Sequence, residues 1–379
     1  MNTVYEVAGV PVNSCLMFDD EWAARRFPRR DLLLGFCDAC GFLSNTVFDS
    51  SVQEYSDRYE DQQSFSPRFR AFQTRLIDGL INRYDIRDKD VLEIGCSKGD
   101  FLIELCRRGG NRGVGVDPSC IPGRVSEPGA EHVRFIQAYY SEDLSDIPCD
   151  VVCCRHTLEH IHQTSDFVAM VRSAIGPRLG TLVFFELPDV RRILRERAFW
   201  DIYYEHCSYF SLGSLARMFR ASRFDVLQLE ADYDDQYLLI VARPTVEPTL
   251  PSLPQEDDLE ALRKEVAGFR EEAGARIEAW RRRIRDLAKQ GKRIAVWGSG
   301  SKCVSFLSTL DICDEIAAVV DINPHRHGRF LARSGKRVDA PQVLRDVKPD
   351  VVIVMNPIYC EEIGRDLDAM AVSAELVAV

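Results

Sequence analysis

The residues with the clearest chemical meaning lie in a glycine turn that follows a short apolar strand. Residues Val91 to Asp100 read V-L-E-I-G-C-S-K-G-D, and a helix-like segment follows from Phe101 to Arg108. Backbone amides at such a turn can face a bound ligand. A second apolar strand, Gly113 to Asp117, ends in an acid roughly 20 residues after the turn, where a carboxylate can accept both hydroxyl protons of a ribose. The two segments together predict a nucleotide-type ligand at one edge of a doubly wound sheet.

The glycine pattern separates this turn from a dinucleotide site. A dinucleotide site uses G-x-G-x-x-G to approach a pyrophosphate, whereas this turn reads E-x-G-x-x-x-G, with Glu93 ahead of Gly95. It resembles motif I of the class I S-adenosylmethionine-dependent methyltransferases, in which the acid helps to place the methionine part of the cofactor. A plain strand, turn and helix without a ligand is the alternative. The predicted cofactor-binding residues are Glu93, Gly95, Cys96, Gly99, Asp117, Pro118, Ala138, Tyr139, Arg155 and His156.

An aromatic segment further along the chain carries a candidate general base. Residues Trp200 to Phe210 read W-D-I-Y-Y-E-H-C-S-Y-F and place Glu205 beside His206. A carboxylate next to an imidazole can orient it and raise its basicity, which suits proton removal near neutral pH. The segment follows the expected fifth strand, and ligands bind beyond the carboxyl ends of such strands. The alternative is an aromatic core patch with a surface Glu-His pair.

A second polar cluster follows the apolar strand Val151 to Cys154. Arg155, His156, Glu159 and His160 come after it, where they would flank the sulfonium end of the cofactor. His156 and His160 are one helical turn apart and so fit a metal pair, but no third ligand stands at a recognisable spacing. We expect these side chains to shape the pocket or to cap the following helix.

The C-terminal third repeats the strand-turn-helix pattern. Residues Arg293 to Lys302 read R-I-A-V-W-G-S-G-S-K, and the strand Ile316 to Val320 is followed by Asp321. This turn, together with Lys302, can cradle a phosphate. Three interpretations stay open: a second nucleotide site, a site for a phosphate of the substrate, and a structural duplicate without a ligand.

Two cysteines near the start form half of a zinc knuckle. Cys37 and Cys40 lie in F-C-D-A-C-G, but a structural zinc needs four ligands, and Cys15 is the one cysteine upstream. No histidine occurs before His132. We therefore expect a knuckle without zinc and assign no metal ligands.

Composition limits the classes of partner. The 379 residues include 48 Lys and Arg against 59 Asp and Glu, a net charge of -11. This balance argues against nucleic acid and membrane surfaces, because both attract basic faces. Residues 1–10 lack the order of a signal peptide, and no apolar run approaches the length of a membrane span. We expect a cytoplasmic protein whose 13 cysteines are buried residues or metal ligands rather than disulfides.

Length and proline spacing divide the chain into three blocks. We expect an N-terminal region over 1–80, a nucleotide-binding domain over 81–245 and a C-terminal unit over 256–379, with a proline cluster at 248–254 before the last. The last block opens with a charged helix in which apolar residues recur every three or four positions. This stripe should lie on a neighbouring domain or on a second subunit, the latter giving a homodimer. Its members are Leu259, Leu262, Val266, Phe269, Ala273, Ile277, Trp280, Ile284 and Leu287.

These features together resemble the three-domain C-methyltransferases of deoxysugar and natural-product biosynthesis. The shared landmarks are C-x-x-C-G, D-R-Y-E-D-Q-Q, motif I, R-H-T-L-E-H-I, Y-E-H-C-S-Y-F and G-S-G-S-K. The resemblance implies an α/β fold with a Rossmann-like doubly wound sheet, a second C-terminal Rossmann-like domain and a small N-terminal region. It also implies methyl transfer from S-adenosylmethionine to a carbon of a small molecule, a nucleotide-linked keto-deoxysugar. The catalytic residues that it implies are His206, Glu205 and Tyr59.

One departure from the family leaves the acceptor open. The family usually carries an earlier C-x-x-C that completes a zinc site, and no such pair precedes Cys37. The alternative acceptor is an aromatic ring such as a phenol or indole, which the aromatic segment would suit. Methylation of oxygen or nitrogen, and a non-catalytic subunit that binds S-adenosylmethionine or a sugar nucleotide, are two further hypotheses. The residues expected to contact the substrate are Tyr203, Tyr204, Tyr209 and Lys302.

Overall fold

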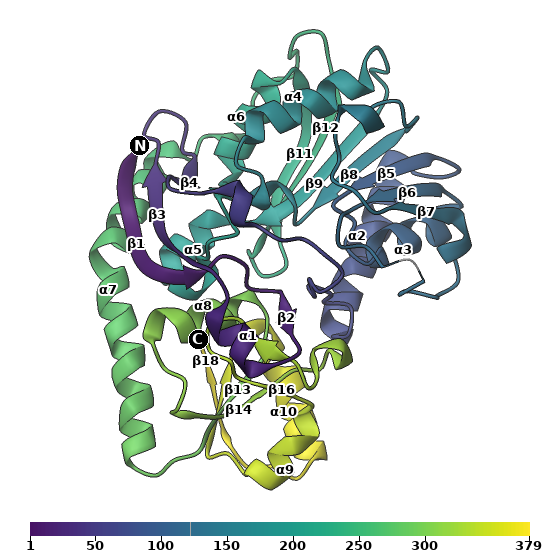
Figure 1. The fold of residues 1–379 in the computed structure, drawn as a ribbon. Coiled ribbons are helices and arrows are strands. Elements are labelled where there is room, and N and C mark those ends of the chain that lie inside the picture. The colour runs from purple at the N-terminus through teal and green to yellow at the C-terminus, as the bar shows by residue number, and fades with distance from the viewer. Residues whose placement is uncertain (122) are drawn as a thin grey trace.

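The structure is a computed structural model that describes residues 1–121 and 123–379. It contains an antiparallel N-terminal unit, a central domain built on a seven-stranded sheet and a C-terminal domain built on a five-stranded sheet. In Figure 1 the central domain lies at the upper right and the C-terminal domain at the bottom. The purple N-terminal strands lie at the left of the same view.

The central sheet has the strand order β11-β12-β9-β8-β5-β6-β7. Its inner strands are apolar runs buried on both faces, as expected for parallel strands that helices cover, and only β12 and its neighbours pair antiparallel. The order reverses between β5 and β8, which is where a doubly wound sheet binds its ligand. The strands are β5 (Asp90–Ile94), β6 (Arg112–Val116), β7 (Val133–Ile136), β8 (Val151–Arg155), β9 (Leu182–Pro188), β11 (Phe224–Asp232) and β12 (Tyr237–Pro244).

Helices cover both faces of this sheet, so the predicted doubly wound fold is confirmed. On one face α2 and α3 share an apolar cluster with the strands, and on the other face α4 and α6 do so. Each of these helices buries an apolar stripe and leaves its polar side to solvent. The four helices are α2 (Pro67–Tyr84), α3 (Asp100–Gly109), α4 (Thr164–Ile175) and α6 (Leu212–Ala221).

The position of α2 corrects the first expected boundary. A division at residue 80 falls inside this helix. Its side chains Phe69, Phe72 and Ile77 are buried in the same cluster as Phe101 and Phe184 of the central domain. Because the apolar stripe of α2 completes the core of the central domain, that domain begins at the start of the helix.

The C-terminal domain is a second Rossmann-like unit with a fully parallel sheet of order β16-β14-β13-β17-β18. The order reverses at β13, so the glycine turn after this strand also lies at a switch point. The elements are β13 (Ile294–Trp297), α8 (Ser301–Leu310), β14 (Ile316–Val320), β16 (Val338–Asp339), α9 (Leu344–Val347), β17 (Val351–Val354), α10 (Cys360–Ala369) and β18 (Glu375–Ala378).

The N-terminal unit shares strands with both α/β domains. Its sheet has the order β1-β3-β4-β10, and β10 comes from the central part of the chain. A separate two-stranded pairing joins β2, just before α1, to β15 of the C-terminal domain. These elements are β1 (Asn2–Pro11), β2 (Met17–Phe18), α1 (Glu21–Arg26), β3 (Arg29–Phe36), β4 (Leu43–Asn45), β10 (Ser208–Tyr209) and β15 (Phe330–Leu331).

The long helix α7 (Leu259–Lys289) is covered within its own chain. Its buried residues include Leu262, Phe269 and Trp280, and it packs on β1, on α8 and on α5 (Val190–Glu196). Figure 1 shows it along one side of the molecule, beside β1 and reaching the C-terminal domain. The apolar stripe therefore lies on neighbouring parts of the same chain, and its burial needs no second subunit.

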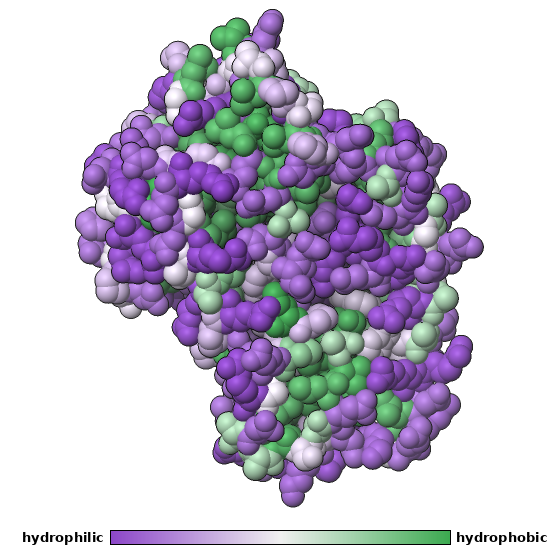
Figure 2. Space-filling model, turned by 180° about the vertical axis from the view of Figure 1, so that it is seen from behind, coloured by the Kyte–Doolittle hydropathy of each residue, from purple (hydrophilic) through white to green (hydrophobic). Residues whose placement is uncertain are grey.

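The outer surface is largely hydrophilic. Figure 2 shows the molecule from behind, with hydrophilic residues over most of the outline and hydrophobic residues gathered in one area over each α/β domain. In the part of the chain that the structure describes, each helix is too short or too polar to span a bilayer.

The burial of α7 gives a stability prediction. The Phe269 ring is fully buried and meets the Tyr5 ring edge to face, with a centroid distance of 5.7 Å. We expect Phe269→Ala to lower the free energy of unfolding by about 3–5 kcal/mol, measured by urea denaturation. The matched control is Trp22→Ala, because Trp22 is 67% exposed and its loss should cost within about 0.5 kcal/mol. Equal effects of the two substitutions would contradict the packing of α7 on β1.

Candidate active site

A cavity of about 630 Å³ lies where three parts of the chain meet. The carboxyl ends of β5, β6 and β8 form one wall, and residues between 55 and 66 form another. The third wall contains the turn and helix start at 298–303 in the C-terminal domain. The two glycine turns recognised in the sequence thus border one shared cavity.

The first glycine turn is shaped by close packing. Gly95 has a φ of +72°, and a Cβ atom there would lie 1.8 Å from Oγ1 of Thr157. Only glycine therefore allows the turn to pass this close to the loop after β8. Gly99 precedes α3 without a side-chain cap, so the first amides of the helix are free to bind an acceptor.

Asp117 lies directly after β6 and beside this turn. Its Oδ2 accepts a hydrogen bond from the Ser97 amide at 2.8 Å. Its Oδ1 accepts hydrogen bonds from the amide and the hydroxyl of Ser119 at 2.6 and 2.7 Å. These bonds fix the carboxylate at the cavity wall, which is the position expected of a ribose-binding acid.

Glu93 is a buried carboxylate whose position fits a cationic ligand. It is 2% exposed, it borders the cavity, and its Oε2 has no hydrogen-bond partner among the described residues. Burial raises the pKa of Glu93 to about 8, although Arg155 acts in the opposite direction. A ligand with a positive charge near this oxygen would satisfy it and favour its ionised form. The amino acid part of S-adenosylmethionine carries such a charge.

The other predicted cofactor residues divide by location. Ala138 and Gly99 are not among the residues that line the cavity, and Gly99 acts at the start of α3 instead. Their contribution to cofactor binding, like that of the whole set, stays a prediction. Those that line the cavity are Glu93, Gly95, Cys96, Asp117, Pro118, Tyr139, Arg155 and His156.

A charge network stiffens the cavity floor after β8. Arg155 donates two hydrogen bonds to Glu186, at 2.9 and 3.1 Å, and the His156 ring lies 2.9 Å from the same carboxylate. Burial disfavours the charged imidazole, but Glu159 and Glu186 outweigh it and raise the pKa of His156 to about 9. His156 therefore acts as a cation in this network and is unsuited to be the base.

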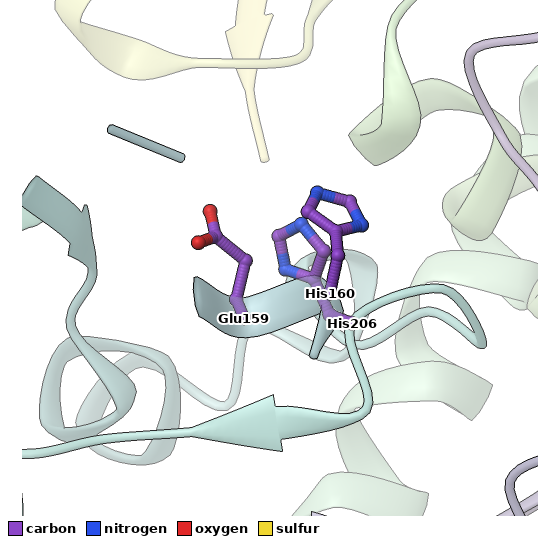
Figure 3. A group of neighbouring side chains, drawn as sticks. All are labelled: Glu159, His160 and His206. Atoms are coloured by element: carbon purple, nitrogen blue, oxygen red, sulfur yellow. The ribbon is translucent and has the colours of Figure 1, made fainter. Parts of the chain in front are cut away.

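His206 is the neutral imidazole of the cavity. It is 6% exposed, and its ring packs against the Tyr203 ring with a centroid distance of 4.2 Å. The His160 ring lies on another side, with a centroid distance of 4.6 Å (Figure 3). Burial holds the pKa of His206 well below its ordinary range, and neighbouring positive groups such as Lys302 act in the same direction. At neutral pH this imidazole has a free lone pair, as a general base requires.

The expected contact between Glu205 and His206 is wrong. The Glu205 carboxylate accepts hydrogen bonds at 3.2 Å from the Ser14 amide, from Asn13 Nδ2 and from the Tyr59 hydroxyl, and a further one from the Ser14 hydroxyl. It faces the N-terminal unit because these donors satisfy its charge, while the His206 ring turns to the other side of the chain and into the cavity. Glu205 is therefore bonded to Tyr59, and no hydrogen bond joins it to His206 among the described residues.

The aromatic residues of the same segment have different surroundings. Tyr59 and Tyr203 line the cavity, whereas Tyr204 and Tyr209 do not. The Tyr204 hydroxyl accepts a hydrogen bond from the Asp49 amide at 2.8 Å, and the Tyr209 hydroxyl bonds to the backbone of Tyr203. The expectation that Tyr204 and Tyr209 contact the substrate is therefore wrong, because both rings fill the core beneath the site.

The second glycine turn carries its own acid and a paired lysine. Asp321 accepts hydrogen bonds from the amide and hydroxyl of Ser299, at 2.7 and 2.6 Å, much as Asp117 holds the first turn. Gly300 precedes α8 without a side-chain cap. Lys302 lines the cavity, and its ammonium group lies 2.7 Å from Asp201.

The fold brings two further residues to the cavity that no sequence pattern indicated. Arg326 is 5% exposed and lines the cavity, where its guanidinium donates to the Ser299 hydroxyl at 3.2 Å and to the Glu60 carbonyl. The Tyr55 hydroxyl lies 2.8 Å from Nδ1 of His160. Neither residue has a local sequence signal, because distant segments of the chain bring them to the cavity.

The structure separates the three N-terminal cysteines. Cys37 and Cys40 lie in the tight turn between β3 and β4, where the Gly41 amide donates to the Cys37 carbonyl. Cys15 is buried at the cavity, with its sulfur 3.1 Å from the Ser301 hydroxyl. These thiols therefore do not form one ligand set.

Comparison with known proteins gives matches over most of the chain. Residues 68–229 match the family model of a methyltransferase domain, and residues 245–377 match that of a C-methyltransferase C-terminal domain. The chain is also similar to C-methyltransferase NovU of Streptomyces niveus, with 28% identity over 306 residues that cover 76% of this chain and 71% of NovU.

Solved structures match the central part more distantly. One is the 1,6-didemethyltoxoflavin-N1-methyltransferase of Burkholderia thailandensis, with 17% identity, a TM-score of 0.33 and coverage of 46% of this chain and 78% of that one. Another is the magnesium protoporphyrin IX methyltransferase of Synechocystis, with 12% identity, a TM-score of 0.37 and coverage of 49% and 91%. Both of those structures contain S-adenosylhomocysteine.

The raised pKa of Glu93 gives a prediction for stability against pH. Its pKa shifts from 4.5 to about 8 in the folded chain, so between these values the folded state keeps a proton that the unfolded state has released. Stability should therefore fall as pH rises through this window, by up to about 1.4 kcal/mol per pH unit. We expect Glu93→Gln, which cannot titrate, to remove this fall in urea denaturation at pH 5 to 8. The exposed Glu6→Gln is the control, and an unchanged pH slope in Glu93→Gln would contradict the assignment.

Proposed function

Since the chain belongs to the S-adenosylmethionine-dependent C-methyltransferases, we propose that its acceptor is a nucleotide-linked keto-deoxysugar. The observation that carries this proposal is the shared cavity. Two Rossmann-type switch points border it, and His206 lines the same cavity. One switch point serves the methyl donor, so the other is available to the nucleotide part of an acceptor.

The donor side of the cavity matches what the cofactor needs. We infer that Glu93 holds the amino acid part, that Asp117 accepts the ribose hydroxyls, and that the turn at Gly95 lets the backbone approach the ligand. When bound, the sulfonium supplies an electrophilic methyl group. The remaining task of the protein is to align the acceptor carbon and to remove its proton.

The acceptor side offers an anion site. Helix α8 begins at Ser301 with amides that no side chain caps, and a helix start favours a phosphate. The Arg326 guanidinium lies beside this turn. A Cβ atom on Gly300 would lie 3.8 Å from its Nη1 atom. Arg326 is a better phosphate ligand than Lys302, because Lys302 is already paired with Asp201.

His206 is the proposed base. Its neutral imidazole faces the cavity and would take the proton from the carbon next to the keto group, which gives the enolate that attacks the methyl group. Tyr59 borders the same cavity, with its hydroxyl held by Glu205 at 3.2 Å. We infer that Glu205 acts by positioning Tyr59 and that Tyr203 packs beside the base.

The hypothesis of an aromatic acceptor rested on the aromatic segment, and the structure places most of that segment away from the cavity. The aromatic segment suggested a wall for a flat ring, but Tyr204, Tyr209 and Phe210 are buried and do not line the cavity. Tyr203 is the one member of this set that does. The polar wall around Ser301 and Arg326 suits a phosphate better than a phenol or indole.

The role of His206 is tested by its removal. We expect His206→Ala to retain the binding of S-adenosylhomocysteine and to lower turnover by about a hundredfold or more. Since the pKa of His206 lies below 6.5, the wild-type rate should fall on the acid side only below that pH. The control is His132→Ala, because the His132 side chain is 54% exposed. Unchanged turnover in His206→Ala would remove this residue from the mechanism.

The acceptor is tested by calorimetry on the full chain saturated with S-adenosylhomocysteine. We expect a thymidine diphosphate 4-keto-deoxysugar to bind, and Arg326→Met to weaken binding about tenfold or more, a loss of about 1.4 kcal/mol. Arg326→Lys keeps the charge, so its affinity for the sugar nucleotide should lie between those of the wild type and Arg326→Met. The control is Arg337→Met, whose side chain is 61% exposed. Turnover of indoles or phenols without binding of the sugar nucleotide would contradict the proposal.

A further inference from the structure

Three side chains of metal-binding types meet at the cavity. Glu159 and His160 lie in the short turn after β8, and His206 lies ahead of β10. One ligand atom of each lies within 4.8 Å of the other two (Figure 3). The sequence spacing fitted His156 and His160 as a metal pair, without a third ligand, and we expected these two residues to shape the pocket or to cap a helix. The fold instead places His206 beside His160.

Glu159 has an oxygen that its surroundings do not satisfy. The residue is 2% exposed, and its Oε2 has no hydrogen-bond partner among the described residues. The other oxygen faces Nδ1 of His156 at 3.6 Å, which is longer than a good hydrogen bond. A buried carboxylate oxygen without a donor is costly, and a bound cation would satisfy it.

The two imidazoles are arranged as ligands usually are. The Tyr55 hydroxyl bonds to Nδ1 of His160 at 2.8 Å, which leaves Nε2 of this ring for a ligand. Metal-bound histidines commonly have such a partner on the second nitrogen, because it fixes the ring. No hydrogen bond to the His206 ring occurs in the described residues, so its nitrogens are available to an ion.

We propose that Glu159, His160 and His206 bind a divalent transition-metal ion of the Zn²⁺ class and that this ion blocks methyl transfer. Two imidazoles and one carboxylate form a donor set that Zn²⁺ prefers, with a fourth position that would face the cavity. The expected ion is an inhibitor and not a cofactor.

Inhibition follows because the metal ion and the substrate proton would need the same lone pair of His206. A metal ion on His206 occupies the nitrogen that would take the substrate proton. This step rests on the proposed function, whereas the binding of the ion does not. The two parts are therefore tested separately.

Binding is tested with Co²⁺, whose visible absorption reports its ligands. We expect one equivalent of Co²⁺ to bind the full chain, with visible bands but without the thiolate charge-transfer band that cysteine ligands produce. Glu159→Gln and His160→Ala should weaken binding by about tenfold or more, and Tyr55→Phe should also weaken it. His132→Ala and the double variant Cys37→Ser/Cys40→Ser are controls that should bind as the wild type does.

The same Co²⁺ titration can contradict the proposed metal site. Absence of binding by a folded wild-type chain would overturn it, as would wild-type binding by Glu159→Gln and His160→Ala. Loss of the signal in the cysteine variant would assign the ion to the knuckle. Each variant is checked for its fold by its thermal unfolding midpoint, and Tyr55→Phe removes only a hydroxyl, so it remains informative if His160→Ala does not fold.

Inhibition is tested by titrating Zn²⁺ into the methyl-transfer assay. We expect the inhibitory concentration to rise about tenfold or more in Glu159→Gln, relative to that variant's own rate without Zn²⁺. Co²⁺ binding without inhibition would overturn the blocking step. If His206→Ala turned over normally, the proposed base would fail while the Co²⁺ titration still decided the metal site.

Discussion

The fold depends on one buried carboxylate. Glu205 is 0% exposed, and such a charge is costly unless donors surround it. The donors come from Asn13 and Ser14 in the N-terminal unit, from Tyr59, and from Ser301 of the C-terminal domain at 3.5 Å. Since these residues lie far apart in the sequence, Glu205 is satisfied only when all three parts of the chain meet.

The cavity forms where the N-terminal unit and the two α/β domains meet. Each α/β domain brings a switch point. Two strand pairings, β10 with β4 and β15 with β2, join both domains to the N-terminal unit. The segment between residues 55 and 66 then borders the space between them. The two switch points border one cavity because the domains share this unit, and neither domain alone encloses that cavity.

Burial and neighbouring carboxylates together give His156 and His206 different protonation states. His156 lies between Glu159 and Glu186 and is held as a cation, with its pKa raised to about 9. His206 forms no ion pair or hydrogen bond with a carboxylate among the described residues, and burial lowers its pKa well below the ordinary value, so that its ring stays neutral. The same cavity is therefore bordered by one histidine held as a cation and by one that we propose as the base. This division also leaves Glu159, beside His160 and His206, with an oxygen that has no donor among the described residues.

Local patterns in the sequence determined the two Rossmann-like halves, the glycine turns with Asp117 and Asp321, and the apolar stripe of α7, because each depends on neighbours within about 20 residues. Tertiary structure decided the rest. It assigned α2 to the central domain, buried Tyr204 and Tyr209 beneath the site, turned Glu205 toward Ser14, and brought Arg326 to the cavity. These outcomes depend on donors and core space supplied by distant segments, which spacing along one chain does not specify.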